Sequence, residues 1–243
     1  MYYKGIDKKV GGVQLSESIV FKKIKLSHLL ITMTDDIDVT SEASKIIIDV
    51  NTSGGGVPSR QLITRVNFKT LCEYTQRLGS VGISKDNKSM YSLIPIGSMD
   101  LDDMDLNVEI NSSSAFSSSS NLRFTVYAIR ISDVTPVLEF QEREIITQGK
   151  TFTNVVALFD INCDSTSTNV TKITFDNSSQ ININHDIAHM FTNSSDQIFD
   201  VINWATLFLD KDMGSGRNIK VEPTNTFVGL VVQVSILNGM LRR

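Results

Sequence analysis

Apolar and polar residues alternate in short segments along the whole chain, with polar turns between them. A period of two is typical of a β-strand that buries one face. The clearest case is residues 122–131, in which Leu122, Phe124, Val126 and Ala128 alternate strictly. Similar runs cover residues 13–26, 29–33, 45–50, 89–96, 105–110, 137–147, 152–161, 171–177 and 227–237. The pattern predicts an all-β protein, because strands and long helices do not alternate as a βαβ fold requires.

Two segments depart from the strand period and predict one short helix in each half of the chain. Residues 67–76 place Phe68, Leu71 and Cys72 at helical spacing, and the Asn67 side chain can cap the first-turn amides. Residues 181–192 carry isoleucine, methionine and phenylalanine at a similar spacing. Both helices are expected at the same place in the order of elements.

One pair of strands in the first half matches a pair in the second half at a constant offset. Residues 91–109 and 204–222 align without a gap, and each has an apolar strand, a polar turn with aspartates and a second alternating strand. The matched pairs are Tyr91 and Trp204, Ile94 and Leu207, Ile96 and Leu209, Leu106 and Ile219, Val108 and Val221, and Glu109 and Glu222. This repeat predicts a β-hairpin that occurs twice in a duplicated domain.

Further matches extend the duplication to most of the chain. Residues 25–34 match 152–161, and residues 44–50 match 171–177, which places Ile46 on Ile173. Many short strands with frequent turns indicate sandwiches or jelly rolls. The predicted organisation is an N-terminal arm (1–12), a first jelly-roll sandwich (13–134) and a second one (135–243).

Composition and charge exclude several classes of protein. The net charge of −4 argues against a protein that coats nucleic acid over its whole surface. The first 26 residues nevertheless hold six lysines against two acidic residues. Lys4, Lys8 and Lys9 in the arm could contact an anionic membrane surface, or the arm could be a solubilising tail.

The cysteines and the hydropathy pattern indicate a chain that folds in a reducing cytoplasm. Cys72 and Cys163 both stand among apolar residues and are expected to be small buried side chains rather than a disulfide framework. No segment has the apolar run of a signal peptide or of a membrane span.

Two clusters of residues could bind metal ions. His185 and His189 stand one helical turn apart with Asp186 between them, but zinc catalysis needs a third ligand and a general base, which favours a solvated helix face. Four aspartates between the matched strands could hold a structural calcium ion, although the EF-hand pattern is absent and a solvated acidic turn explains them as well. These aspartates are Asp100, Asp102, Asp103 and Asp105.

Two aromatic residues at one repeat position could form a carbohydrate platform. Tyr91 and Trp204 occupy this position, but an aromatic side chain inside a strand is more often part of a core. The chain contains no phosphate-binding loop, nucleophile elbow or kinase signature. No enzymatic activity is therefore expected.

With two similar β-rich halves, a helix in each and no catalytic constellation, the chain resembles the double jelly-roll major capsid proteins of tailless icosahedral viruses. Its small size is most similar to the forms in membrane-containing bacteriophages, such as the corticovirus and finnlakevirus groups. The resemblance covers residues 13–237 and rests on architecture rather than on a motif.

The resemblance implies a structural protein of the virion that is assembled in the host cytoplasm. Three chains would form a pseudo-hexameric homotrimer, and trimers would tile the shell beside neighbouring capsomers and minor capsid proteins. The arm would lie near an internal lipid membrane, and the serine-rich segment 111–120 would be a flexible tongue and a candidate tower loop. Sequence-specific nucleic-acid binding is not implied. The competing interpretation is a tandem β-sandwich lectin or adhesin.

Overall fold

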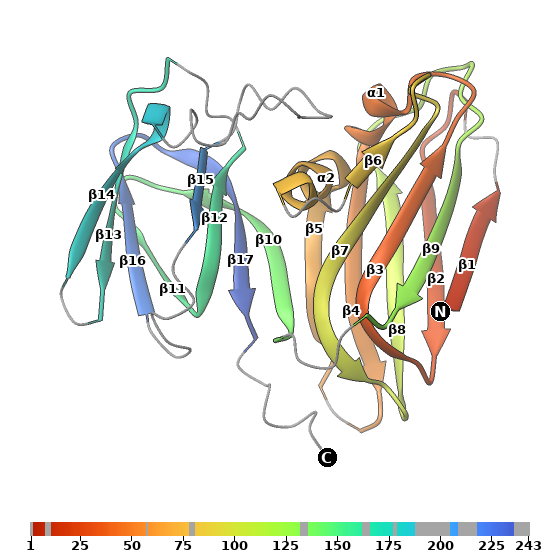
Figure 1. Cartoon of the computed structure of the whole chain (residues 1–243), viewed down its shortest axis with the longest axis horizontal. Coiled ribbons are helices and arrows are strands. Elements are labelled where there is room, and N and C mark those ends of the chain that lie inside the picture. Colours follow the sequence, from red (N-terminus) through yellow and green to blue (C-terminus); the bar gives the residue numbers. More distant parts are fainter. Residues whose placement is uncertain are drawn as a thin grey trace. The chain divides into compact units, whose positions relative to one another are not determined.

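The structure is a computed structural model that describes residues 2–7, 11–56, 58–77, 81–131, 136–161, 166–176, 179–187, 205–208 and 218–235. The chain divides into two compact units, unit 1 over Met1–Leu138 and unit 2 over Glu139–Met240. Figure 1 shows unit 1 from red to yellow-green and unit 2 from green to blue. The division lies shortly after the expected boundary at residue 134.

Unit 1 contains nine strands and two helices among its described residues. The strands are β1 (Tyr2–Asp7), β2 (Ser16–Lys22), β3 (Lys25–Thr34), β4 (Ile46–Gly54), β5 (Arg60–Asn67), β6 (Val81–Ile83), β7 (Ser89–Asp100), β8 (Met104–Ser112) and β9 (Arg123–Ile129). The helices are α1 (Val39–Ala43) and α2 (Phe68–Arg77).

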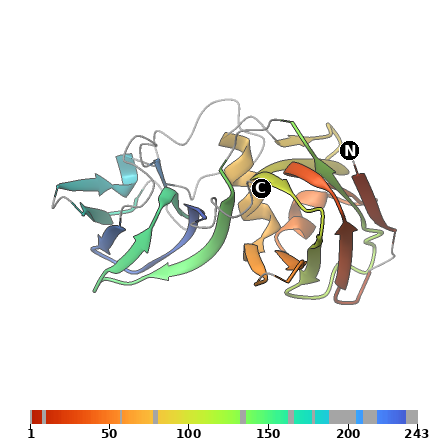
Figure 2. The same cartoon turned by 90° about the horizontal axis from the view of Figure 1, so that it is seen from below.

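The strands of unit 1 form two antiparallel sheets that face each other across a core (Figure 2). One sheet has the order β1-β9-β3-β7-β6, and the other contains the run β5-β4-β8-β2. If the short β6 is left out, the other strands of unit 1 can be counted from first to eighth along the chain. In this count, the first sheet holds the first, eighth, third and sixth strands. The second holds the second, seventh, fourth and fifth. This interleaving of eight strands is the jelly-roll topology.

In its described residues, unit 2 repeats this order with eight strands. They are β10 (Leu138–Ile145), β11 (Lys150–Thr153), β12 (Val155–Asp160), β13 (Val170–Phe175), β14 (Gln180–Asn184), β15 (Ala205–Phe208), β16 (Asn218–Pro223) and β17 (Phe227–Val234). The orders are β10-β17-β12-β15 and β11-β16-β13-β14. In chain order these are again the first, eighth, third and sixth strands, and the second, seventh, fourth and fifth. The sequence-based prediction of two all-β jelly rolls is confirmed.

Each core consists of the inward-facing residues of the two sheets. In unit 1, Leu29, Ile31 and Met33 of β3 face Ile48 and Val50 of β4, and all five are fully buried. Burial of each such side chain stabilises the fold by about 1.5–3 kcal/mol. In unit 2 the core comprises Ile145, Phe152, Leu158, Ile173, Phe175, Ile219, Val221, Phe227 and Val231. Strand alternation therefore predicts the buried faces correctly.

The expected N-terminal arm over residues 1–12 is wrong for half of its length. Tyr2–Asp7 forms β1, which pairs antiparallel with β9 from Tyr2 opposite Ala128 to Asp7 opposite Arg123. This strand completes the eight strands of the first jelly roll. The polar and basic composition of the segment is compatible with an edge strand, because edge strands commonly carry lysine.

The repeated hairpin is also a wrong interpretation, although its strands exist. β7 pairs with β3 and β6, whereas β8 pairs with β2 and β4 in the opposite sheet. In unit 2, β15 pairs with β12, and β16 pairs with β11 and β13. The two matched strands therefore belong to different sheets in each unit. Alternation and a polar turn look the same in a hairpin and in a crossing between sheets.

The helix of unit 1 agrees with its prediction, and that of unit 2 agrees only in part. α2 begins directly after Asn67, whose Oδ1 accepts a hydrogen bond of 2.9 Å from the Lys69 amide. Cys72 on this helix is buried, and burial raises the pKa of its thiol. In unit 2, Gln180–Asn184 is strand β14, and helical residues begin at His185. No helix in the described part of the chain is long and apolar enough to span a membrane.

Candidate functional site

A chain of three buried polar side chains lies in unit 2. Asp160 is the last residue of β12, Thr171 lies on β13, and His185 directly follows β14. Their exposed fractions are 5%, 0% and 1%. β12 belongs to one sheet and β13 to the other. The three side chains therefore connect the two layers of the second jelly roll.

The imidazole of His185 is held on both sides. Its Nδ1 lies 2.9 Å from Asp160 Oδ2, and its Nε2 lies 2.6 Å from Thr171 Oγ1. With the Asp160 carboxylate ionised, a neutral imidazole donates from Nδ1 and accepts the Thr171 hydroxyl at Nε2. The ring of Phe227 stands edge-on to the imidazole at a centroid distance of 5.1 Å. Polar and apolar contacts thus fix the ring together.

A hydroxyl, an imidazole and a carboxylate in this order resemble a catalytic triad. A nucleophile must reach its substrate, however, and the Thr171 hydroxyl is fully buried. The arrangement therefore stabilises the fold and does not form an accessible active site. Sequence patterns single out His185 of this group but neither Asp160 nor Thr171, because the three side chains meet only in the folded unit. The sequence feature that could have identified the group is a polar residue at an inward-facing strand position, as at Thr171.

The zinc hypothesis finds no support in the geometry. Both ring nitrogens of His185 are engaged by side chains, so neither is free to coordinate a metal ion. The carboxylate of Asp186 accepts a hydrogen bond from the Ile187 amide, and His189 lies outside the described residues. Among the residues that the structure describes, no group of three or more His, Cys, Asp or Glu side chains could hold a metal ion.

The four aspartates of the calcium hypothesis are spread over the crossing between β7 and β8. Asp100 forms an ion pair with Lys25, and the hydrogen bond from Lys25 lowers the pKa of the Asp100 carboxyl. Asp105 Oδ2 lies 3.9 Å from the ammonium group of Lys22. Asp102 and Asp103 are exposed in the turn. Lysines therefore balance two of the four carboxylates, and calcium binding at this turn stays a prediction.

Of the three lysines that were expected to face a membrane, only Lys4 belongs to the described part of the chain. Lys4 belongs to β1, where its backbone lies opposite Val126. Lys8 and Lys9 lie outside the described residues. A role of these lysines at a lipid surface stays a prediction, but Lys4 belongs to a sheet and not to a free arm.

The aromatic residue of β7, Tyr91, was expected in a core but is exposed. Tyr91 is 46% exposed and points to the outer face of its sheet, because its neighbours Met90 and Ser92 are buried. A Cβ atom at Gly82, on the adjacent β6, would lie 2.2 Å from the Tyr91 ring. The ring therefore lies over the glycine. Trp204 is outside the described residues.

The serine-rich segment 111–120 is not a free tongue. The buried carboxylate of Asp35 accepts hydrogen bonds of 2.6 Å from the Ser120 hydroxyl and 2.7 Å from the Asn121 amide. Phe116, in the middle of the segment, is also buried. The prediction of a flexible tongue is therefore wrong, because a buried acid and a buried aromatic ring hold the loop to unit 1.

A second group of contacts holds the loop from the side of α1. The buried Glu42 carboxylate accepts hydrogen bonds from Lys45 Nζ at 2.9 Å and from the Ser117 amide at 3.3 Å. The Lys45 ammonium lies 5.9 Å from the centroid of the Phe116 ring. The Phe116 amide donates a hydrogen bond of 3.2 Å to the Val13 carbonyl. The loop thus also holds Gly12 and Val13, which precede β2.

Sequence comparison finds no relative, since no protein-family model and no curated protein matches the chain. Structure comparison finds several. The crystal structure of the major capsid protein P2 from Bacteriophage PM2 has a TM-score of 0.55 at 8% identity, covering 98% of this chain and 100% of that one. The crystal structure of the STIV MCP has a TM-score of 0.50 at 9% identity, covering 96% and 95%.

A further structure, of Sulfolobus Turreted Icosahedral Virus, has a TM-score of 0.56 at 8% identity and covers 96% of this chain and 89% of that one. The similarity extends over both units and over nearly the whole length of the compared chains. Since the identities are low, the similarity concerns the fold. The chain therefore shares the all-β double jelly-roll architecture of these capsid proteins.

Proposed function

We propose that the chain is a structural subunit of an icosahedral viral capsid and has no catalytic role. The observation that supports this most is the presence of two complete jelly rolls with one strand order in a single chain. The compared capsid proteins have the same extent, since the match covers 95–100% of two of them. The one buried arrangement that resembles a catalytic triad is inaccessible to a substrate.

The duplication suggests how such subunits would assemble. Three chains with two similar units each supply six similar wedges, which can fill a site of hexagonal symmetry in a shell. The proposed oligomer is a homotrimer, closed by heterologous contacts around a three-fold axis. Neighbouring trimers and minor capsid proteins would complete the contacts, and the virion is the proposed location.

A measurement of mass in solution tests this function. The purified chain of 27.0 kDa is expected to sediment as a trimer at micromolar concentration and to dissociate on dilution. Electron micrographs of the concentrated protein should show hexagonal outlines or closed particles. A monomer at all concentrations, with no particles at high protein concentration, would contradict a capsid role.

A further inference from the structure

The two sheets of unit 1 present chemically different outer faces. On β8 and β4, the outward side chains are polar except for Ile47, and they lie opposite one another, as Asn107 and Asn51 do. Asn107 Nδ2 donates hydrogen bonds to Asn51 Oδ1 at 3.0 Å and to Ser53 Oγ at 2.8 Å. Carboxylates of Asp49 and Glu109 extend this face. This surface is suited to contact with water.

The outer face of the other sheet is mainly apolar over β7, β3 and β9. In one row across the strands, Leu30 lies opposite both Leu93 and Tyr127. In the next row, His28 lies opposite Pro95 and Ile129. These side chains are half-buried. We call the surface formed by His28, Leu30, Tyr91, Leu93, Pro95, Tyr127 and Ile129 the β3 face.

The β3 face has no Lys, Arg, Asp or Glu side chain, and Thr32 and Thr125 complete its third row beside Tyr91. Three strands about 4.8 Å apart and three rows about 6.7 Å apart give a flat area of roughly 300 Å². The largest apolar patch on a typical monomeric protein is about 300–600 Å² and is often functional, so the β3 face has the size of a candidate contact surface. The polar face of the same unit shows that the sequence does supply polar residues where a sheet faces water.

We propose that the β3 face is a contact surface for a second copy of this chain. Stable interfaces bury about 800 Å² on each partner, with an apolar, aromatic centre and a polar rim. The β3 face has the size and composition of such a centre. An anionic membrane or a nucleic acid would require cationic side chains, which this face lacks. The assignment rests on the proposed function, which requires contacts between copies.

A pair of double variants tests the assignment. Leu30→Thr with Leu93→Thr replaces two facing leucines by a residue that favours strands, so the sheet is retained. The matched control is Val20→Thr with Ile47→Thr, because both are half-buried aliphatic residues on the outer face of the opposite sheet. Sedimentation equilibrium is expected to show association weakened roughly tenfold or more in the first variant. The control variant should associate like the wild type.

Hydroxyl-radical labelling of the wild-type chain provides a test that needs no variant. Tyr91 is 46% exposed, so its labelling should fall severalfold when the chain associates. Equal association of both double variants, or unchanged labelling of Tyr91 in the oligomer, would overturn the assignment and leave the capsid function standing. A wild-type chain that stays monomeric would overturn the capsid function itself. Binding of the monomer to neutral lipid vesicles, lost in the Leu30 and Leu93 variant, would identify a membrane as the occupant instead.

Discussion

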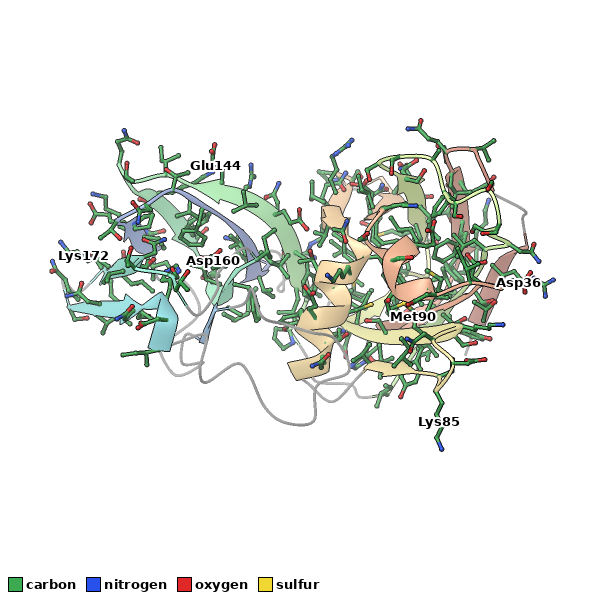
Figure 3. All side chains as sticks on the ribbon, turned by 90° about the horizontal axis from the view of Figure 1, so that it is seen from above. Asp36, Lys85, Met90, Glu144, Asp160 and Lys172 are labelled. Atoms are coloured by element: carbon green, nitrogen blue, oxygen red, sulfur yellow. The ribbon has the colours of Figure 1, made fainter. Side chains whose placement is uncertain are left out.

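His185 Nδ1 lies 2.9 Å from Asp160 Oδ2, and both side chains are almost completely buried in unit 2. Figure 3 shows Asp160 inside the unit, whereas Lys172 extends outward from it. Thr171 Oγ1 completes the contact on the other ring nitrogen. Polar groups in a core need partners, and here each partner comes from a different strand or turn. The group should therefore be sensitive to the loss of any member.

The substitution Asp160→Ala should lower the free energy of unfolding by about 3 kcal/mol or more, because it leaves a buried imidazole N–H without its acceptor. Urea denaturation followed by circular dichroism measures the loss. The exposed Glu144, labelled in Figure 3, gives the control Glu144→Gln, which should stay within about 0.5 kcal/mol of the wild type. Equal stabilities of the two variants would show that the buried pair contributes nothing.

The substitution Asn67→Ala should destabilise unit 1 by about 1 kcal/mol, the usual effect of removing a helix cap. Asn67 accepts a hydrogen bond from the Lys69 amide and donates one of 2.6 Å to the Ser44 carbonyl, so two contacts are lost. Thermal unfolding measures the effect. Asn67→Ser keeps a capping oxygen and should recover part of the stability. If serine is no better than alanine, the cap is not the source of the effect.

The sequence predicts strands and their buried faces well, because alternation depends only on neighbouring residues. It does not show which strands pair, since pairing depends on residues far apart. The structure places Val108 opposite Val50, and Val221 opposite Ile173, so Ile173 corresponds to Val50. The sequence match placed it on Ile46. The sequence match is therefore shifted along the strand by an even number of residues. Because side chains alternate between the two faces of a strand, the match still assigns Ile173 to the buried face.

The N-terminal strand and the buried network could not be predicted for a related reason. Tyr2–Asp7 shows no strict alternation of apolar and polar residues, and only its pairing with β9 identifies it as a strand. The serine-rich segment likewise has the composition of a flexible chain. Its order comes from Asp35 and Glu42, which precede it by more than sixty residues and accept its hydrogen bonds. Composition describes a segment alone and misses such distant partners.

The substitution Asp35→Ala should release the loop that follows β8. Its carboxylate accepts hydrogen bonds from the Ser120 hydroxyl, the Asn121 amide and the Asp36 amide. Without this acceptor, amide exchange between residues 113 and 122 should become at least about tenfold faster, since local opening costs less free energy. Hydrogen–deuterium exchange with mass spectrometry measures the rate.

The control for the loop experiment is Asp103→Ala, in the exposed turn between β7 and β8. Asp103 is acidic but makes no contact with the serine-rich segment among the described hydrogen bonds and ion pairs, so its loss should not change exchange there. Faster exchange in both variants would point to a general loss of stability. Unchanged exchange in Asp35→Ala would show that Phe116 and Glu42 hold the loop without it.

Association through the β3 face should weaken at acidic pH. His28 lies between Pro95 and Ile129 on this surface, and partial burial lowers its pKa from the ordinary value of 6.5. The unfolded chain therefore binds a proton more readily than the folded chain, so the contribution of neutral His28 to stability is present above pH 6.5 and is lost as the pH falls through the lowered pKa. Covering the side chain with a second copy disfavours the proton further. Sedimentation from about pH 8 down to about pH 5 should show association that weakens as the pH falls below 6.5 and through the lowered pKa of His28, whereas His28→Gln, which cannot titrate, should show less change. If the two proteins have the same pH profile, another group controls the association.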